Sequence, residues 1–308
     1  MTVAVAVDLG GSKTAAARVS ADGGIGEVIA APTPAGDGPE AVLDTVAGLV
    51  GRLLADDVAG VGIGTAGVVD PETATIVSAT DVFARWVGTN LADGVRARLG
   101  LAAGSIVEVR NDVDAHALGE AWLGAGRGRD SMLMVAVGTG VGGGIVLPGG
   151  LWTGAHRLAG EIGHMPTPGA EALRCPCGRL GHLEAIAAGP AIERRHAELT
   201  GEAAPGPEIA ARAEAGDPTA AGVIAAAAPG LGTAIAGMVT LLDPACVVLG
   251  GGVAQAGPAW WGPLTAACRA ALVDLVSGID LLPASLGPRA ALFGAAKAVF
   301  DAAAIPTD

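Results

Sequence analysis

Residues 3–19 read VAVAVDLGGSKTAAARV and join two apolar runs through a pair of glycines. The first run, Val3–Val7, ends at the acidic Asp8, and the second extends from Thr14 to Val19. Valine favours strands, and a Gly-Gly pair lets the chain reverse over a few residues. We therefore predict a strand, a glycine turn and a second strand at the start of the chain.

The same order recurs in the second half of the chain. Met132–Val137 is an apolar run that enters a glycine-rich turn, Gly138–Gly144, and leaves it through Ile145–Leu147. Because two halves that begin alike suggest an internal duplication, we predict a duplicated α/β fold with a cleft between its halves. Periodic spacing predicts helices at 40–54, at 112–122, at several places between 190 and 242, and at 289–304.

Composition and charge narrow the class of protein. The 308 residues carry a formal net charge of −13, no Tyr and only three Phe, so we expect no nucleic-acid partner, which would need basic patches and stacking aromatics. The N-terminus has no basic segment before its first apolar run, and the apolar stretches alternate with turns. We therefore expect neither a signal peptide nor a membrane span, and a cytoplasmic location in which thiols stay reduced.

The glycine turns are candidates for binding phosphate. GTGVGG, residues 138–143, matches G-x-G-x-x-G, but a dinucleotide-binding turn opens a helix and this one opens a β-run. The motif is therefore interpreted as a hairpin turn, whose backbone N–H groups can point at a bound anion. In DLGGSKT, Asp8 can hold a metal ion and residues 12–14 can donate to phosphate oxygens, while GGG, residues 250–252, suits a nucleotide's sugar and base. Any one turn could simply connect strands, but together they favour a nucleotide site.

RCPCGRLGHLE, residues 174–184, holds two of the four cysteines in the chain. Cys175 and Cys177, with His164 upstream and His182 downstream, form a nitrogen and sulfur set that suits tetrahedral Zn²⁺. Four protein ligands leave no open position, so this zinc would be structural and would fix the loop. The alternative is two reduced thiols and two unconnected histidines.

Several segments, taken in order, resemble the motifs of the ROK family of sugar kinases. They are DLGGSKT (8–14), RNDVDAHALGE (110–120), VGTGVGGG (137–144), AGEIGH (159–164) and CPCGRLGHLE (175–184). The family belongs to the actin-like ATPase superfamily. The resemblance therefore implies two ribonuclease-H-like α/β domains, with ATP and sugar meeting in an interdomain cleft.

The resemblance also implies that the last helix returns to the N-terminal domain. We expect an N-terminal α/β domain of residues 1–117, joined by a C-terminal helix of about 290–308. The C-terminal α/β domain then spans residues 118–289 and contains the zinc loop.

The helix that begins near Asp112 is expected to carry the chemistry. Phosphoryl transfer needs a base near the attacking hydroxyl, and Asp112 matches the family's catalytic Asp. Asn111 matches a family residue that holds a sugar hydroxyl, O4. Either residue could also cap the helix. Asp114 and His116, on the same helix, are expected to be surface or packing residues.

The remaining sugar contacts are expected from the second half and from one loop of the first. Glu161, His164 and Glu184 match sugar-binding residues of the family, and Gly67, in GTAGVVD (64–70), brings backbone close to the ligand. Two carboxylates can also mark a glycosidase, but nothing else supports hydrolysis. The contacts to ATP and Mg²⁺ are expected at turn residues, which are Asp8, Gly10, Gly11, Ser12, Lys13, Thr14, Gly138, Thr139, Gly140, Gly142, Gly251 and Gly252.

The resemblance implies an ATP-dependent hexose kinase, most simply a glucokinase that makes the 6-phosphate, acting as a homodimer. An N-acetylglucosamine or N-acetylmannosamine kinase is the alternative, because SATDVFARWVG (78–88) lacks an Asn that the family often carries there. Family members usually have a third cysteine where this chain has His182, although a Cys₂His₂ set still suits zinc. A transcriptional regulator of the family would carry a winged helix before the first strand, which we do not expect here. A sugar sensor without catalysis would bind sugar but not turn over ATP.

Overall fold

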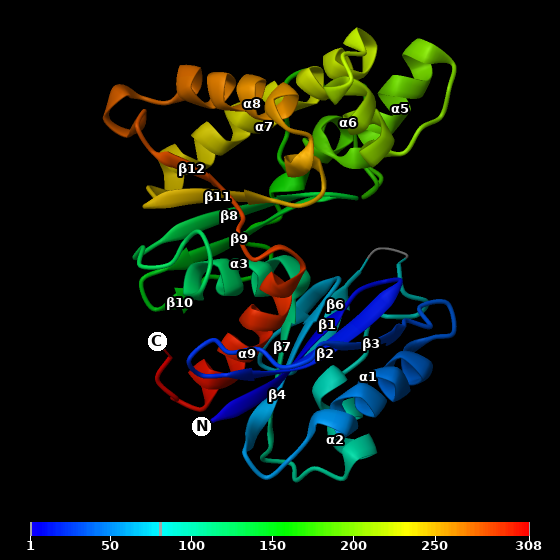
Figure 1. Ribbon diagram of the computed structural model, residues 1–308, viewed down its shortest axis with the longest axis vertical. Coiled ribbons are helices and arrows are strands. Elements are labelled where there is room, and N and C mark those ends of the chain that lie inside the picture. The colour runs from blue at the N-terminus through cyan, green and yellow to red at the C-terminus, as the bar shows by residue number, and fades with distance from the viewer. Residues whose placement is uncertain (1, 80–81, 308) are drawn as a thin grey trace. The chain divides into compact units, whose positions relative to one another are not determined.

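The structure is a computed structural model that describes residues 2–79 and 82–307. Its contacts divide the chain into two units, coloured along the chain in Figure 1. The N-terminal unit contains the chain up to Gly128, the segment Gly150–Leu158 and the chain from Ser285 onward. The C-terminal unit contains Arg129–Gly149 and Ala159–Ala284.

The N-terminal unit is built on a five-stranded sheet with the order β3-β2-β1-β4-β7. β1 runs antiparallel to β2 and parallel to β4, which is parallel to β7. A separate hairpin, β5–β6, lies outside this sheet. The strands are β1 (Val3–Leu9), β2 (Lys13–Ser20), β3 (Ile29–Pro32), β4 (Val58–Thr65), β5 (Val68–Asp70), β6 (Thr75–Ser78) and β7 (Ile106–Asn111). The helices are α1 (Pro39–Leu53), α2 (Leu91–Leu99), α3 (Asp112–Trp122) and α9 (Ala290–Ala302), with a short 3₁₀ turn η4 (Gly287–Arg289).

The two faces of this sheet are covered by different helices. The larger side chains of β1, such as Val5 and Val7, belong to the core formed with α1 and α2, whereas Ala4 and Ala6 belong to the core formed with α9. Small residues let α9 approach closely: a Cβ on Gly62 of β4 would lie 2.0 Å from the carbonyl oxygen of Ala295. The alternation of large and small residues along β1 therefore decides which helix packs on which face.

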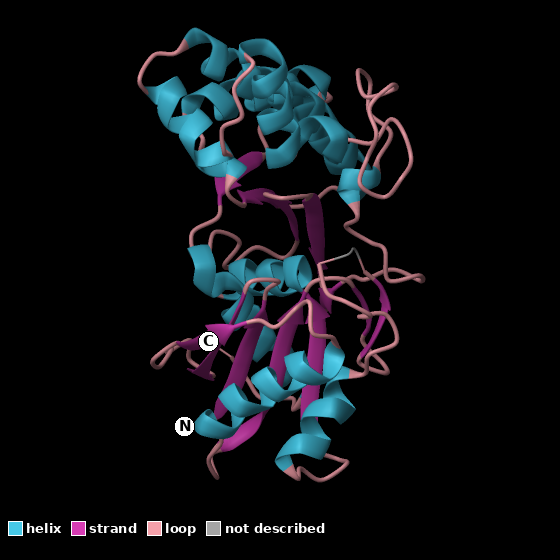
Figure 2. Ribbon diagram, turned by 90° about the vertical axis from the view of Figure 1, so that its right-hand side faces the viewer, coloured by secondary structure: helices cyan, strands magenta, loops and turns pink. Residues whose placement is uncertain are grey.

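The C-terminal unit repeats the strand–turn–strand start, with strands β9, β8, β11 and β12 side by side. Figure 2 shows its helices as a layer beside the strands. The strands are β8 (Met132–Val137), β9 (Val141–Leu147), β11 (Cys246–Gly250) and β12 (Asp280–Pro283), and a two-residue strand, β10 (Gly150–Leu151), follows β9 along the chain. The helices are α4 (Glu184–Ala187), α5 (Gly189–Thr200), α6 (Gly206–Glu214), α7 (Pro218–Leu242) and α8 (Pro258–Ala271), with 3₁₀ turns η1 (Ile162–His164), η2 (Val253–Gln255) and η3 (Asp274–Val276).

The expected domain boundary after residue 117 needs correction, because it falls inside α3. This helix continues to Trp122 and packs along α9 in the N-terminal unit. A Cβ on Gly119 would lie 2.2 Å from the carbonyl oxygen of Ala290, and one on Gly294 would lie 1.7 Å from that of Ala115. The boundary between the two units instead lies after Gly128.

Helix α7 is one long apolar stretch, although the apolar runs of the sequence were expected to alternate with turns. Its 25 residues are long and apolar enough to cross a membrane. However, 56% of its most apolar window is buried inside the structure. Val223, Ile224, Leu231 and Ile235 are part of the core that α7 forms with α8 and the sheet. The apolar character of α7 is thus accounted for by core packing.

Candidate functional site

Asn111 and Asp112 form the corner between β7 and α3. Asn111 is the N-cap of α3: its Oδ1 accepts hydrogen bonds from the backbone N–H groups of Val113 at 2.8 Å and Asp114 at 3.3 Å. Its Nδ2 donates to the carbonyl oxygen of Gly67 at 3.0 Å. The expected cap is therefore Asn111, and it also fixes the loop that carries Gly67. An amide nitrogen carries a second hydrogen, which remains for a ligand.

Asp112 lies at the first position of α3, where its Oδ1 accepts a hydrogen bond from the N–H of Val113 at 2.9 Å. Burial raises the pKa of the Asp112 carboxyl, the nearby Asp8 carboxylate raises it further, and His116 opposes both. Burial likewise raises the pKa of Asp8, against the effect of Lys13. Asp8 and Asp112 thus form a pair of partly buried carboxylates, and hard oxygen ligands of this kind fit Mg²⁺.

His116 and Glu120 also belong to this corner; His116 was expected only as a surface or packing residue, and Glu120 was given no role. Burial lowers the pKa of His116, while Asp112 and Glu120 on the same helix raise it. Their spacing of four residues, which puts side chains on one face of a helix, was the available signal. Glu120 is fully buried and accepts hydrogen bonds from the N–H groups of Ala125 at 2.8 Å and Leu286 at 2.8 Å. Glu120 therefore fixes Ala125 and Leu286. These residues lie close in sequence to the two points where the chain passes between the units, after Gly128 and before Ser285.

The β1–β2 turn presents backbone and two exposed polar side chains. Gly10 donates its N–H to the carbonyl oxygen of Lys13 at 3.1 Å, which closes the turn. Ser12 and Lys13 are exposed. The Thr14 hydroxyl is fully buried and lies 2.8 Å from Oγ1 of Thr33, so it faces away from the solvent that Ser12 and Lys13 meet. Of the expected phosphate donors, the structure exposes the side chains at positions 12 and 13.

The glycine turn of the C-terminal unit consists of Gly138, Thr139 and Gly140, which is shorter than expected. Strand β9 already begins at Val141, and Gly142 pairs with Ala136 of β8. Gly138 donates its N–H to the carbonyl oxygen of Gly140 at 2.9 Å. The turn is therefore a tight hairpin, as the sequence predicted, with an exposed Thr139 at its tip.

Gly251 and Gly252 directly follow β11. Gly251 has φ +88°, and a Cβ there would lie 2.2 Å from the carbonyl oxygen of Val137 at the end of β8. Only glycine fits both demands. The turn after β11 thus lies against the strand that leads into the glycine turn.

Glu161, His164 and Glu184 lie close together in the C-terminal unit. His164 Nε2 is 3.6 Å from Glu161 Oε2. Burial raises the pKa of Glu161, Glu184 adds to this effect and His164 opposes it. Glu184 also has a partner that the sequence did not predict: its Oε2 accepts the backbone N–H of Val141 at 2.9 Å. These three expected sugar contacts are therefore neighbours within the C-terminal unit, and Glu184 also contacts the glycine turn.

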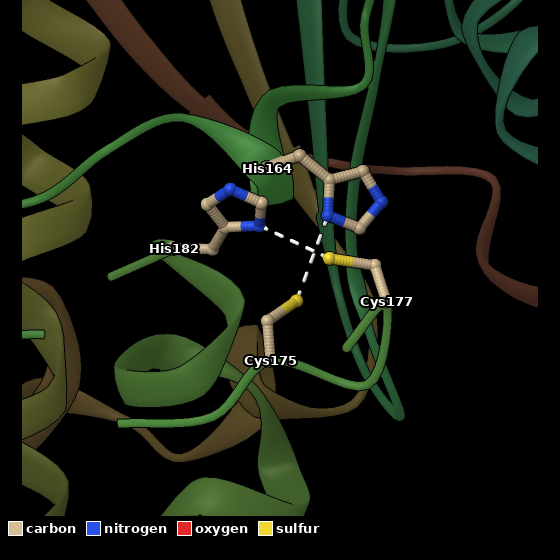
Figure 3. Close-up of side chains that lie close together, drawn as sticks. All are labelled: His164, Cys175, Cys177 and His182. Carbon is tan, nitrogen blue, oxygen red and sulfur yellow. Dashed lines mark hydrogen bonds between the residues drawn. The ribbon is translucent and has the colours of Figure 1, made fainter. Parts of the chain in front are cut away.

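The side chains of His164, Cys175, Cys177 and His182 converge, as Figure 3 shows. Their ligand atoms all lie within 4.8 Å of one another. Cys175 Sγ is 3.6 Å from His164 Nδ1, and Cys177 Sγ is 3.2 Å from His182 Nδ1. Tetrahedral zinc with ordinary Zn–S and Zn–N bonds separates sulfur and nitrogen ligands by about 3.6 Å, so the four atoms fit this ion. We call these four residues the Cys/His cluster.

Local turns bring the cluster together. Gly178 donates its N–H to the carbonyl oxygen of Cys175 at 2.9 Å, and its φ of +89° suits glycine. Burial raises the pKa of Cys175 to about 11, with the neighbouring Cys177 contributing. A raised pKa favours the protonated thiol, whereas a bound cation favours the thiolate and would therefore lower the pKa again. His164 presents Nδ1 to the cluster and Nε2 to Glu161, so one ring can serve both.

The chain is similar to known proteins over nearly its whole length. The sequence profile of the ROK family matches residues 4–302. A glucokinase from Streptomyces coelicolor is 33% identical over 316 residues, which cover 96% of this chain and 97% of that protein. A ROK hexokinase structure from Thermus thermophilus has a TM-score of 0.85 at 32% identity and covers 98% of this chain and 99% of that one.

A second solved structure is informative because it contains ligands. It is a ROK family glucokinase from Streptomyces griseus in complex with glucose and AMPPNP, with a TM-score of 0.81, 33% identity, and coverage of 96% of this chain and 98% of that one. These matches confirm the expected α/β fold of two actin-like ATPase domains. Because the family profile spans nearly the whole chain, this protein belongs to the ROK family.

Proposed function

We propose that this chain is an ATP-dependent hexose kinase that transfers the γ-phosphoryl group of ATP to the 6-hydroxyl of glucose. The observation that carries the proposal is the match over 96% of the chain to a glucokinase solved with glucose and AMPPNP. The Asn111–Asp112 corner supports it, because it offers an amide donor and a carboxylate with a raised pKa side by side.

In the reaction, the 6-hydroxyl oxygen attacks the γ-phosphorus as the bond to the bridging oxygen of ADP breaks. Asp112 accepts the hydroxyl proton late in this step, and its raised pKa makes it a better base than an exposed Asp. Asn111 donates its second amide hydrogen to a sugar hydroxyl, and Glu161, His164 and Glu184 bind the others. Most of the rate enhancement comes from positioning and electrostatics.

The nucleotide phosphates are bound by the two glycine-rich turns. Ser12, Lys13 and the backbone of Gly10 and Gly11 act from the β1–β2 turn, and the residues from Gly138 to Gly142 act from the C-terminal unit. Gly251 and Gly252 lie against the nucleoside. Mg²⁺ would be held by Asp8, with Asp112 nearby, and would neutralise phosphate charge. Zn²⁺ would be held by the Cys/His cluster and would fix the loop that carries Glu184.

The proposal includes a homodimer in the cytoplasm, which the family resemblance implies. Sedimentation velocity of the purified chain tests the dimer, because a dimer has a larger sedimentation coefficient than a monomer. In a lysed cell, the protein should remain in the supernatant after the membranes are pelleted.

ADP release, measured with a coupled assay over a panel of hexoses, tests the catalytic proposal. We expect the highest kcat/KM with glucose. A higher kcat/KM with N-acetylglucosamine or N-acetylmannosamine would assign the chain to the alternative substrate class. Sugar binding without ADP release would make it a sensor.

A further inference from the structure

One carboxylate, that of Glu184, contacts both the glycine turn and the Cys/His cluster. Its Oε2 accepts the backbone N–H of Val141, the first residue of β9, at 2.9 Å. A Cβ on Gly140 would lie 2.6 Å from the same oxygen. The turn therefore fits directly against the carboxylate, and a larger residue at position 140 would have to displace it.

The other oxygen of Glu184 faces the cluster. Oε1 lies 3.8 Å from Cys175 Sγ, and Glu184 follows the cluster residue His182 by two positions. Leu183, between them, is fully buried and donates its N–H to the carbonyl oxygen of Met165 at 2.9 Å. The cluster loop and the buried Leu183 thus fix where the carboxylate lies.

The other side of the glycine turn, at Gly138, is held by a backbone hydrogen bond. The carbonyl oxygen of Gly138 accepts the N–H of Gly189, at the start of α5, at 2.8 Å. A Cβ on Gly189 would lie 3.1 Å from that oxygen. On the opposite side of the turn, the Glu184 carboxylate fixes Val141 by accepting its N–H.

We propose that Glu184 is a positioning residue for nucleotide binding. Its carboxylate contacts both the Cys/His cluster and the glycine turn, so the position of the turn depends on the folded cluster. This proposal rests on the proposed function, in which the turn binds ATP phosphates. It adds to the sugar contact, because Val141 uses Oε2, while Oε1, which faces Cys175 Sγ, has a second lone pair that can accept a sugar hydroxyl. The cluster then supports both substrates through one side chain.

Amide hydrogen exchange of the ligand-free protein tests the contact without any need for activity. In Glu184→Ala, exchange of the Val141 amide should rise about tenfold or more, because the loss of a hydrogen bond to a charged group weakens local protection. Glu193→Ala is the matched control: Glu193 also accepts a backbone N–H, that of Gly206 at 2.6 Å, in the same unit. The control should leave the Val141 amide unchanged.

Two further variants, one of them with its own control, test the contact in other ways. Gly140→Ala should displace the carboxylate and raise the same exchange, whereas Gly138→Ala, whose Cβ would meet nothing within 4 Å, should not. Cys177→Ala should also raise it, by a smaller factor, because Cys177 is exposed and its loss acts only through the cluster. If exchange at Val141 stays as in the wild type in Glu184→Ala, or rises equally in Glu193→Ala, the proposal is overturned.

Calorimetry with AMP-PNP in the absence of sugar tests the consequence for the nucleotide. Glu184→Ala should raise the Kd about tenfold, and Glu193→Ala should leave it within twofold. An unchanged Kd in Glu184→Ala would overturn the role in nucleotide binding, even if exchange rises. If the wild type does not bind AMP-PNP, the proposed function fails, and this role for Glu184 fails with it; the exchange experiment still shows whether the contact itself exists.

Discussion

Replacing Asn111 by Ala separates the structural role of this side chain from its proposed contact with sugar. The change removes the acceptor of the Val113 and Asp114 N–H groups and the donor to the Gly67 carbonyl. Loss of an Asn cap costs about 1 kcal/mol of unfolding free energy, and the loss of the loop hydrogen bond costs about another 1 kcal/mol. We expect Asn111→Ala to destabilise the N-terminal unit by about 2 kcal/mol.

Asn90→Ala is the matched control. Asn90 caps α2 in the same unit by accepting the N–H of Asp93 at 2.9 Å, and its Nδ2 donates to the carbonyl oxygen of Thr73 at 2.9 Å. Its replacement therefore removes the same kinds of bond, at a similar cost of about 2 kcal/mol. Asn90 has no part in the proposed sugar site.

Urea denaturation measures the unfolding free energies, and initial rates at varied glucose measure KM. Both variants should lose similar stability, but only Asn111→Ala should raise the KM for glucose, by about tenfold for one lost hydrogen bond to the ligand. Equal KM values for the two variants would refute the sugar contact. A loss of stability well below 1 kcal/mol in Asn111→Ala would refute the capping geometry.

Four further outcomes are expected. Asp112→Asn should lower kcat by about 10²-fold with a much smaller change in sugar affinity, and a near-normal kcat would remove Asp112 as the base. The wild-type kcat/KM should fall as pH drops through a pKa above the ordinary 3.8 of Asp, because burial raises the pKa of this base and only its ionised form accepts a proton. Metal analysis should find about one zinc per chain, lost in His182→Ala and retained in His182→Cys; zinc-free wild-type protein would contradict the cluster assignment. Gly294→Ala should destabilise by at least about 1–3 kcal/mol, because its Cβ would lie 1.7 Å from the Ala115 carbonyl, whereas Gly237→Ala in α7 has open space and should not.

Long periodic segments with clear ends could be predicted from the sequence. The bounds of β8 and α3 agree with their predicted ranges, and α3 has an Asn cap at its start. The short elements β5, β6 and α2 were not predicted. α2 has only nine residues, and charged residues interrupt its apolar positions, so its periodicity is weak; Asn90 at its start and Gly100 at its end were the available signals.

The glycine turn shows why composition alone misplaces a boundary. Glycines 142–144 suggest a turn, yet they lie in β9. Glycine is needed there because other backbone packs against the strand: a Cβ on Gly143 would lie 2.9 Å from the carbonyl oxygen of Met134. Such a requirement appears only once the partner segment is known.

The candidate site could be predicted where its residues are near in sequence. The Cys/His cluster follows from spacing over residues 164–182, and its four ligand atoms do converge. The bond between Glu184 and Val141 spans 43 positions, and it could not be read from either motif alone. The segment 78–88, on which substrate choice was judged, includes positions 80 and 81, which lie outside the described residues.

Formation of glucose 6-phosphate is the most direct test of the central claim. Purified protein with ATP, Mg²⁺ and glucose is coupled to glucose-6-phosphate dehydrogenase, so that NADPH appears only when the 6-hydroxyl of glucose has been phosphorylated. We predict NADPH formation that depends on both ATP and glucose and that falls about 10²-fold in Asp112→Asn. No NADPH above background with the wild type, although glucose binds, would contradict the account.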